Sequence, residues 1–345
     1  MKRSTIRNCA RLLAARALAA AALAALTAVF SPIAHPAAPA KKIALKTAFT
    51  NTGAASAPLW AAQDGGYFAE EGLEVTIARI QAGAPVMAAI QNGEVPIGYI
   101  GANSVIEANL RGASFVIVGG FMSRLGYKLY TIAAVERAEQ LKGKALGTSN
   151  FGSITHVAGQ VATEHLGIKD AVKYIQTGGQ PETLAAMKAG IVQGGAFQPP
   201  EDLKAKEAGF RELVDVGAIG VAFQTSAITS TRKWARENPE VIERYLRALI
   251  KATHRLRTDK EFAIATIAKN SRTDNRQILE TAYSYFADKW TPDGIPSTPG
   301  MERVLHFIAA KNPAAQAAKP EQFMDLTIAN RIKQSGLVEK LYKGK

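Results

Sequence analysis

The sequence of 345 residues contains very little cysteine and histidine. Its one cysteine, Cys9, lies before an apolar run near the N-terminus, so the chain beyond that run has no thiol for a disulfide, a thiolate metal ligand or a nucleophile. The histidines after residue 40 are not spaced as H-x-x-x-H, and no Cys-x-x-Cys pair accompanies them: His156, His165, His254 and His306. We therefore expect no metal and no cofactor.

The sequence also lacks the motifs of common catalytic sites. No Gly-x-Ser-x-Gly elbow and no Gly-x-x-x-x-Gly-Lys phosphate loop occurs. Ser153 and His156 lie three positions apart in one predicted helix, which is too local for a nucleophile, a base and an orienting group. We expect no catalytic residues and a protein that is not an enzyme.

The apolar run near the N-terminus is too short for a membrane anchor. It covers residues 17–30, whereas a spanning helix needs roughly 20 residues. Five basic residues precede it, and the small-x-small sequence Ala38-Pro39-Ala40 follows it. This pattern predicts a signal peptide over residues 1–40, cleavage before Lys41, and export of the remaining chain.

Positive charge is spread along the chain and forms no dense patch. The formal net charge is +13, and the densest points are Lys41-Lys42 and the pair Arg255 and Arg257. Neither has the interleaved aromatic residues of a nucleic-acid surface. We expect no nucleic-acid partner.

Two segments about a hundred residues apart repeat one pattern. Thr50-Asn51-Thr52-Gly53 reappears as Ser149-Asn150-Phe151-Gly152, and the pattern of residues 87–98 reappears over 184–195, at offsets of 99 and 97 positions. Some matches in an Ala- and Gly-rich chain arise by chance, but the shared order predicts two similar lobes. A cleft between two such lobes is a natural binding site.

Short apolar strands alternate with amphipathic helices along the chain. This alternation predicts an α/β fold with mainly parallel sheets flanked by helices, in two lobes with a ligand cleft between them. We expect residues 41–125 and 226–345 to form lobe 1, which would include the C-terminal helices. Residues 126–225 would form lobe 2, with crossings near 120–130 and 220–228 acting as the hinge.

Four loops share one arrangement, in which a strand ends, small or polar residues follow, and a helix begins. They cover residues 50–57, 101–104, 149–155 and 198–200. The carboxyl ends of strands and the first turns of helices bind ligands in open α/β sheets, and the helix N-termini favour anionic oxygens. The expected ligand-binding residues in and near these loops are Thr50, Asn51, Thr52, Trp60, Ala102, Asn103, Ser104, Asn150, Phe151, Gly152, Ser153, Thr155, Phe197 and Gln198.

Each of these residues has a structural alternative. Asn and Ser at such positions often only cap a helix or a turn, and Asn103 is an expected N-cap. Trp60, Phe151 and Phe197 would either line the cleft or pack in the core. The loops contain no charged residue, so we expect uncharged inner faces. A cationic ligand is disfavoured because it would require a carboxylate or an aromatic cage.

Several motifs resemble one family. Residues 66–75 read Gly-Tyr-Phe-Ala-Glu-Glu-Gly-Leu-Glu-Val, and together with 90–99, 141–147 and 234–249 they are similar to the periplasmic solute-binding proteins of the nitrate/sulfonate/taurine class of ABC importers. That class is grouped with yeast thiamine-pyrimidine synthase. The resemblance spans roughly residues 43–260. It implies a type II periplasmic-binding-protein-like fold, a periplasmic location and delivery of a small ligand to an inner-membrane permease.

Departures from the family limit what the resemblance implies. Pro96 stands where members often have Asp, and the cysteine-rich iron motif of the yeast synthase has no counterpart, which sets the enzymatic branch aside. We expect a monomer that captures a small organic or inorganic anion, such as a sulfonate, nitrate or a carboxylate. The alternatives are a neutral pyrimidine or aromatic ligand in the same cleft, and a periplasmic ligand-sensing protein or enzyme.

Overall fold

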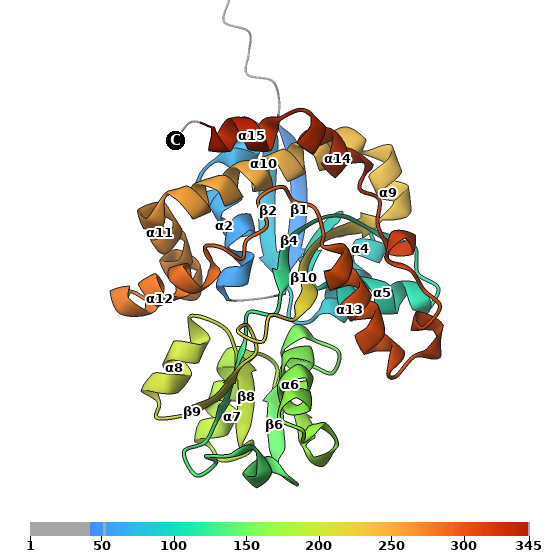
Figure 1. Ribbon diagram of the computed structural model, residues 1–345. Helices are drawn as coiled ribbons and strands as arrows, with labels where there is room; N and C mark the ends of the chain where they lie inside the picture. Colours follow the sequence, from blue (N-terminus) through green and yellow to red (C-terminus); the bar gives the residue numbers. More distant parts are fainter. Residues whose placement is uncertain (1–41, 51–52, 344–345) are drawn as a thin grey trace, which may run out of the picture. The chain divides into compact units, whose positions relative to one another are not determined.

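The computed structural model describes residues 42–50 and 53–343 (Figure 1). The predicted signal peptide over residues 1–40 and the predicted ligand-binding residues Asn51 and Thr52 lie outside the described residues. All contacts below belong to the unit Lys42–Lys345. Among the described residues, no helix is both long and apolar enough to cross a membrane.

The first sheet has five strands in the order β2-β1-β3-β10-β4. Strand β1 is parallel to β2 and β3, whereas β10 is antiparallel to β3 and β4. The apolar run at the start of β4 is buried at every position, as expected for a strand covered on both faces. The strand bounds are β1 Ile43–Phe49, β2 Leu73–Arg79, β3 Ile97–Ile100, β4 Phe115–Arg124 and β10 Ala222–Thr231.

The second sheet has five strands in the order β7-β6-β8-β5-β9. Strand β6 is parallel to β7 and β8, whereas β5 is antiparallel to β8 and β9. The two sheets share one arrangement. Strand β1 lies between its parallel neighbours β2 and β3, as β6 lies between β7 and β8, and an antiparallel strand, β10 or β5, then pairs with β3 or β8. The strand bounds are β5 Lys128–Thr131, β6 Ala145–Thr148, β7 Lys173–Gln176, β8 Gly194–Phe197 and β9 Arg211–Asp215.

Helices join and flank these strands. Those between strands of the first sheet are α2 Ala57–Asp64, α3 Tyr67–Glu70, α4 Gly83–Gln91 and α5 Ala102–Leu110; those of the second are α6 Ile154–His165, α7 Gln180–Lys188 and α8 Glu201–Glu207. The helices after β10 are α9 Arg232–Glu237, α10 Pro239–Thr258, α11 Lys260–Ser271, α12 Arg276–Phe286, α13 Thr298–Ala309, α14 Thr327–Gln334 and α15 Leu337–Tyr342. Single 3-10 turns are η1 Ala54–Ser56, η2 Ala138–Leu141, η3 Lys169–Ala171, η4 Pro313–Ala315 and η5 Pro320–Phe323.

Helix α10 attaches the C-terminal segment to the first sheet. Its apolar residues recur every three to four positions, so one face is buried against α2 and α3 while the other carries charges. The Tyr245 ring stacks on Phe68 at 5.1 Å between centroids, and its hydroxyl lies 3.0 Å from Thr47 Oγ1 of β1. Glu71, at the end of α3, pairs with Arg247 and Lys251.

The chain passes between the sheets twice, from β4 to β5 and from β9 to β10. In each sheet, the loops that lead from a parallel strand to the next helix start at the carboxyl ends of the strands. These loops therefore lie together at one edge of the sheet. The predicted α/β class with two sheets flanked by helices is confirmed, although each sheet is mixed. The lobe boundaries and the hinge stay predictions.

Candidate functional site

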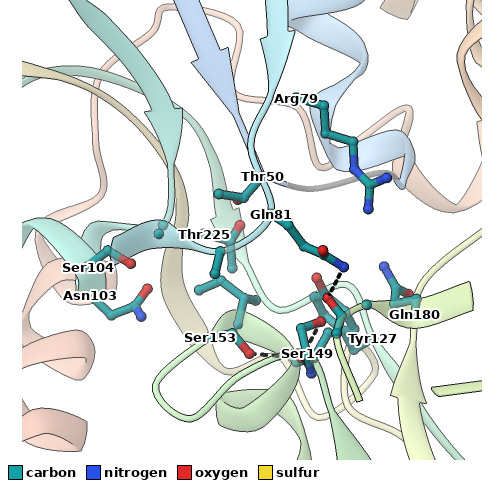
Figure 2. A pocket seen from close by; sticks show the side chains of 17 residues that line it. Thr50, Arg79, Gln81, Asn103, Ser104, Tyr127, Ser149, Ser153, Gln180 and Thr225 are labelled. Carbon is teal, nitrogen blue, oxygen red and sulfur yellow. Dashed lines mark hydrogen bonds between the residues drawn. The ribbon is translucent and has the colours of Figure 1, made fainter. Parts of the chain in front are cut away.

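Loops from the two sheets line one pocket, shown in Figure 2. It holds about 630 Å³ of space, counted together with its opening to solvent. The first sheet and its loops contribute Thr50, Arg79, Gln81, Ala82, Gly83, Gly101, Asn103, Ser104 and Thr225. The second sheet and the chain leading to it contribute Tyr127, Ser149, Ser153, Ile154, Thr155, Gly178, Gly179 and Gln180.

Three of the four predicted loops contribute to this pocket. The predicted residues that line it are Thr50, Asn103, Ser104, Ser153 and Thr155. The structure thus brings together residues separated by a hundred positions, as the repeat suggested. Their contact with a ligand stays a prediction.

The loop before α6 is held by a network of hydroxyl groups. Ser153 caps the helix by accepting a hydrogen bond from the His156 N–H, as the capping alternative predicted, and it also lines the pocket. Thr155 Oγ1 accepts a hydrogen bond from the Ser149 N–H at 2.9 Å and lies 3.0 Å from Thr148 Oγ1. The first turn of a twelve-residue helix therefore meets the pocket, where its partial positive charge favours anionic oxygens.

Asn103 does not cap its helix, so that prediction is wrong. Gly101 is the N-cap of α5, and the Asn103 amide nitrogen instead donates a hydrogen bond to the carbonyl oxygen of Gly152 in the loop before α6. Within the described part of the chain, the buried Asn103 Oδ1 accepts no hydrogen bond. A buried acceptor without a donor costs stability, and this oxygen has too little accessible surface to face the pocket.

Three of the predicted residues lie beside the pocket, in a neighbouring hollow. This second hollow of about 900 Å³, again including its opening, is lined by Asn150, Phe151 and Gly152 and shares Ser104 and Ser153 with the pocket. The Phe151 side chain is 59% exposed. These residues therefore line the neighbouring hollow and not the pocket itself.

Three other predicted residues lie in the core. Trp60 is 2% exposed and packs edge-on against Phe49, with 6.1 Å between ring centroids. Phe197 packs edge-on against Tyr130 at 6.3 Å, and Ala102 is fully buried. The core-packing alternative describes the positions of Trp60 and Phe197, and none of the three residues lines the pocket.

Gln198 does not line the pocket but forms hydrogen bonds with two residues that do. Its backbone N–H donates to Gln180 Oε1 at 2.8 Å, and its side-chain amide donates to the Tyr127 hydroxyl at 2.9 Å. The side-chain oxygen of Gln180 is occupied by this bond. Its side-chain nitrogen, a hydrogen-bond donor, is therefore directed into the pocket (Figure 2). Gly53 passes so close that a Cβ there would lie 2.3 Å from the Gln198 side chain.

Sequence reasoning missed two segments that contribute three polar side chains to the pocket wall. The end of β2 and the loop after it contribute Arg79 and Gln81, and the loop after β7 with the start of α7 contributes Gly178 and Gln180. Gln81 and Gly178 are offset by 97 positions, the offset of the repeat, and Gln81 Nε2 donates to the Gly178 carbonyl oxygen at 2.5 Å. Both loops follow a strand and precede a helix, so the same rule could have found them. Tyr127 and Thr225 carried no such signal.

The pocket is not uncharged, which corrects the prediction of uncharged inner faces. Arg79 lines it, and no Asp or Glu does. Among the described residues, no carboxylate lies within 4.0 Å of the Arg79 guanidinium. Figure 2 shows the guanidinium directed toward the amides of Gln81 and Gln180. An unpaired cation beside hydrogen-bond donors attracts an anion.

Two buried carboxyl groups in the first turn of α8 each have a lysine partner. Glu201 Oε1 lies 3.4 Å from Lys204 Nζ, and Asp202 Oδ2 lies 3.7 Å from Lys128 Nζ. Burial raises the pKa of Asp202 to about 7, although the Lys128 charge acts in the opposite direction. Burial also raises the pKa of Glu201, against smaller opposing effects that include the Arg79 charge. Neither carboxyl lines the pocket, and the described residues contain no cluster of three or more His, Cys, Asp or Glu placed to hold a metal ion.

The arrangement of two mixed sheets with a pocket at their facing loops is the periplasmic-binding-protein fold. A solved structure with this fold, the alkanesulfonate-binding protein SsuA from Xanthomonas axonopodis pv. citri bound to MOPS, matches with a TM-score of 0.68 and 18% identity. The match covers 84% of this chain and 100% of that one. The model of the NMT1/THI5-like family matches residues 54–262, and the chain belongs to this family. The resemblance predicted from the sequence motifs is confirmed.

Sequence relatives include both binding proteins and enzymes. The taurine-binding periplasmic protein of Escherichia coli (strain K12) is 28% identical over 202 residues, which cover 56% of this chain and 62% of the relative. The match thus spans less than two thirds of that protein. The 4-amino-5-hydroxymethyl-2-methylpyrimidine phosphate synthase of Aspergillus parasiticus is 23% identical over 254 residues, covering 67% of this chain and 72% of the relative.

Proposed function

We propose that this protein is the substrate-binding component of an ABC importer and captures a small organic or inorganic anion in the pocket between its two sheets. In this role it is exported to the periplasm, acts as a monomer, delivers its ligand to a permease in the inner membrane and leaves the ligand chemically unchanged. The unpaired Arg79 guanidinium at the pocket wall is the observation that carries the proposal.

The charges and donors around Arg79 favour an oxyanion. The Gln180 amide nitrogen and the first turn of α6 add hydrogen-bond donors on the side of the second sheet. An anion between them would contact both halves of the pocket, so its binding free energy would favour the arrangement in which the two halves are close. A sulfonate, nitrate or a carboxylate has oxygens that suit such donors.

A neutral ligand has less support from the pocket wall. A pyrimidine or another aromatic compound would be favoured by aromatic side chains from both sheets, but the lining contains one aromatic residue, Tyr127. Trp60 and Phe197 are in the core instead. Because the relatives include pyrimidine phosphate synthases, pyrimidines should be tested beside the anions.

A thermal-shift screen of the purified chain would test the proposal with sulfonates, nitrate, carboxylates and pyrimidines. We expect an anion to raise the melting temperature and to bind with one-to-one stoichiometry in calorimetry. Arg79→Gln should then weaken binding roughly 10- to 100-fold, because a hydrogen bond to a charged group contributes about 1.5–3 kcal/mol.

The matched control is Arg236→Gln, which removes the same charge from an exposed position on α9. It should leave the affinity unchanged. Stabilisation by pyrimidines alone, or equal effects of the two substitutions, would contradict the proposal. So would recovery of a chemically altered ligand after incubation with the protein.

A further inference from the structure

The pocket of Figure 2 is lined by the first turns of four helices. The residues concerned are Gly83 of α4, Ser104 of α5, Thr155 of α6 and Gln180 of α7. Each helix has at least nine residues, and α4, α5 and α7 have no side-chain cap. The N–H groups of a first turn carry partial positive charge. The pocket wall is therefore positive in more places than at Arg79.

One set of donors lies at the Arg79 end of the pocket. Gln180 is 5% exposed, and its side-chain oxygen accepts the hydrogen bond from the Gln198 N–H. Its side-chain nitrogen has no hydrogen-bond partner among the described residues, and it keeps accessible surface toward the pocket. Figure 2 shows the Arg79 guanidinium on the same side. This end thus offers a full positive charge and a free amide donor.

A second set of donors lies at the opposite end, where Figure 2 shows Ser104 far from Arg79. The Ser104 hydroxyl forms no hydrogen bond with any described residue. The first turn of α4 lies so close that a Cβ on Gly83 would collide with this hydroxyl. In the same way, a Cβ on Gly101 would collide with the Ile154 side chain at the start of α6. Three helix N-termini therefore meet around one unpaired hydroxyl.

The Ser104 end has no charge of its own to balance these partial charges. Among the described lining residues, Arg79 alone is charged. The carboxylate on α5, Glu107, lines the neighbouring hollow and pairs with Arg111 at 4.0 Å. A ligand with one ionised group would satisfy Arg79 and leave the donors around Ser104 to water. A ligand with a second ionised group would satisfy both ends.

We propose that the pocket binds a small dianion whose two ionised groups are separated by a short chain. One group lies at Arg79 and Gln180, and the other lies at Ser104 and the first turns of α4, α5 and α6. Dicarboxylates and sulfocarboxylates have this chemistry. The inference rests on the proposed capture of an anion and adds the number and placement of its charges.

Calorimetry with succinate, its half-amide succinamate and butyrate tests the proposal, because the three share a four-carbon chain and differ at one end. Malonate and glutarate with their half-amides vary the chain length, and 3-sulfopropanoate with propane-1-sulfonate gives the same comparison for a sulfonate. We expect the best dicarboxylate to bind about 10-fold or more tightly than its half-amide. A hydrogen bond to a charged group is roughly twice as strong as a neutral one, and the helix N-termini add to the difference.

Two variants separate the ends of the pocket. Ser104→Ala should reduce the preference for the dicarboxylate over the monocarboxylate about 5- to 30-fold, whereas Arg79→Gln should weaken both. The melting temperature of Ser104→Ala without ligand should equal that of the wild type, because the hydroxyl has no partner in the described chain. The matched control is Ser284→Ala, at an exposed position on α12, which should change no affinity.

The proposal is overturned if the half-amides bind as tightly as the dicarboxylates at every chain length, or if Ser104→Ala leaves the preference unchanged. It is also overturned if a monoanion binds while no dicarboxylate or sulfocarboxylate binds at millimolar concentration. In each of these cases the proposed capture of an anion still stands. Binding of no anion at all would refute that function as well.

Discussion

A hydrogen bond between helix α12 and the second sheet offers a test of whether ligand binding depends on how the two sheets are held together. The Tyr285 hydroxyl on α12 donates to Asp215 Oδ1 at the end of β9, at 3.0 Å. Lys289 Nζ lies 4.5 Å from the centroid of the same ring, and Lys128 Nζ lies 5.7 Å from it. Tyr285 thus links a C-terminal helix to the second sheet. Tyr285→Phe would remove the hydroxyl and retain the ring.

The magnitude follows from the partners of this bond. A hydrogen bond to a carboxylate contributes about 1.5–3 kcal/mol when buried, and Tyr285 is half-buried, so about 1–2 kcal/mol is expected here. If the ligand binds only the arrangement that contains the bond, its loss lowers the population of that arrangement. The dissociation constant of the transport ligand should then rise about 5- to 30-fold.

The assay is calorimetry with the anion identified by the thermal-shift screen, beside a urea titration of each variant. Tyr283→Phe is the matched control, since it lies on the same helix and its hydroxyl forms no hydrogen bond with any described residue. Tyr283→Phe should change neither affinity nor stability. An unchanged affinity in Tyr285→Phe would refute the reasoning, because the bond would then be equally present with and without ligand.

Two further predictions concern stability. Burial raises the pKa of Asp202 to about 7. The folded chain therefore binds the carboxyl proton more tightly than the unfolded chain does. As the pH rises from about 4 to 7, the carboxyl group lowers the free energy of unfolding. Asp202→Asn should therefore raise the free energy of unfolding at pH 8 by about 2–4 kcal/mol, with little effect at pH 4; urea titrations that show a loss at pH 8 would contradict this. Ala82 has a φ of 79° and a ψ of 151°, a combination that glycine adopts without strain. Ala82→Gly should thus stabilise the fold by about 1 kcal/mol, and a lower midpoint in urea would show that the backbone is not strained there.

Much of the fold followed from local sequence patterns. The alternation of apolar strands with helices predicted an α/β class, and the repeat predicted two similar units. The sequence did not show that β5 and β10 would run antiparallel to their neighbours. The direction of a strand that follows a passage between the sheets depends on tertiary contacts and not on the strand's own residues. Helix α10 showed its buried face in the sequence because its apolar residues recur at helical spacing.

The candidate site was predicted less completely. Thr50, Asn103 and Ser153 were predicted from the rule that ligands bind where a strand ends and the next helix begins. The same rule was not applied to the loops after β2 and β7. Arg79 is the last residue of a strand, and the sequence does not say which side of the sheet edge such a residue faces. Trp60 illustrates the opposite error, since it is close to a pocket loop in sequence but is turned into the core by its helix.

The most direct test of the central claim is a crystal structure of this chain with the tightest-binding anion from the screen. The account predicts an intact ligand in the pocket of Figure 2, with its oxygens within hydrogen-bond distance of Arg79 and of a donor from the second sheet, such as Gln180. A ligand bound elsewhere, or one held in the pocket without contact to Arg79, would contradict it.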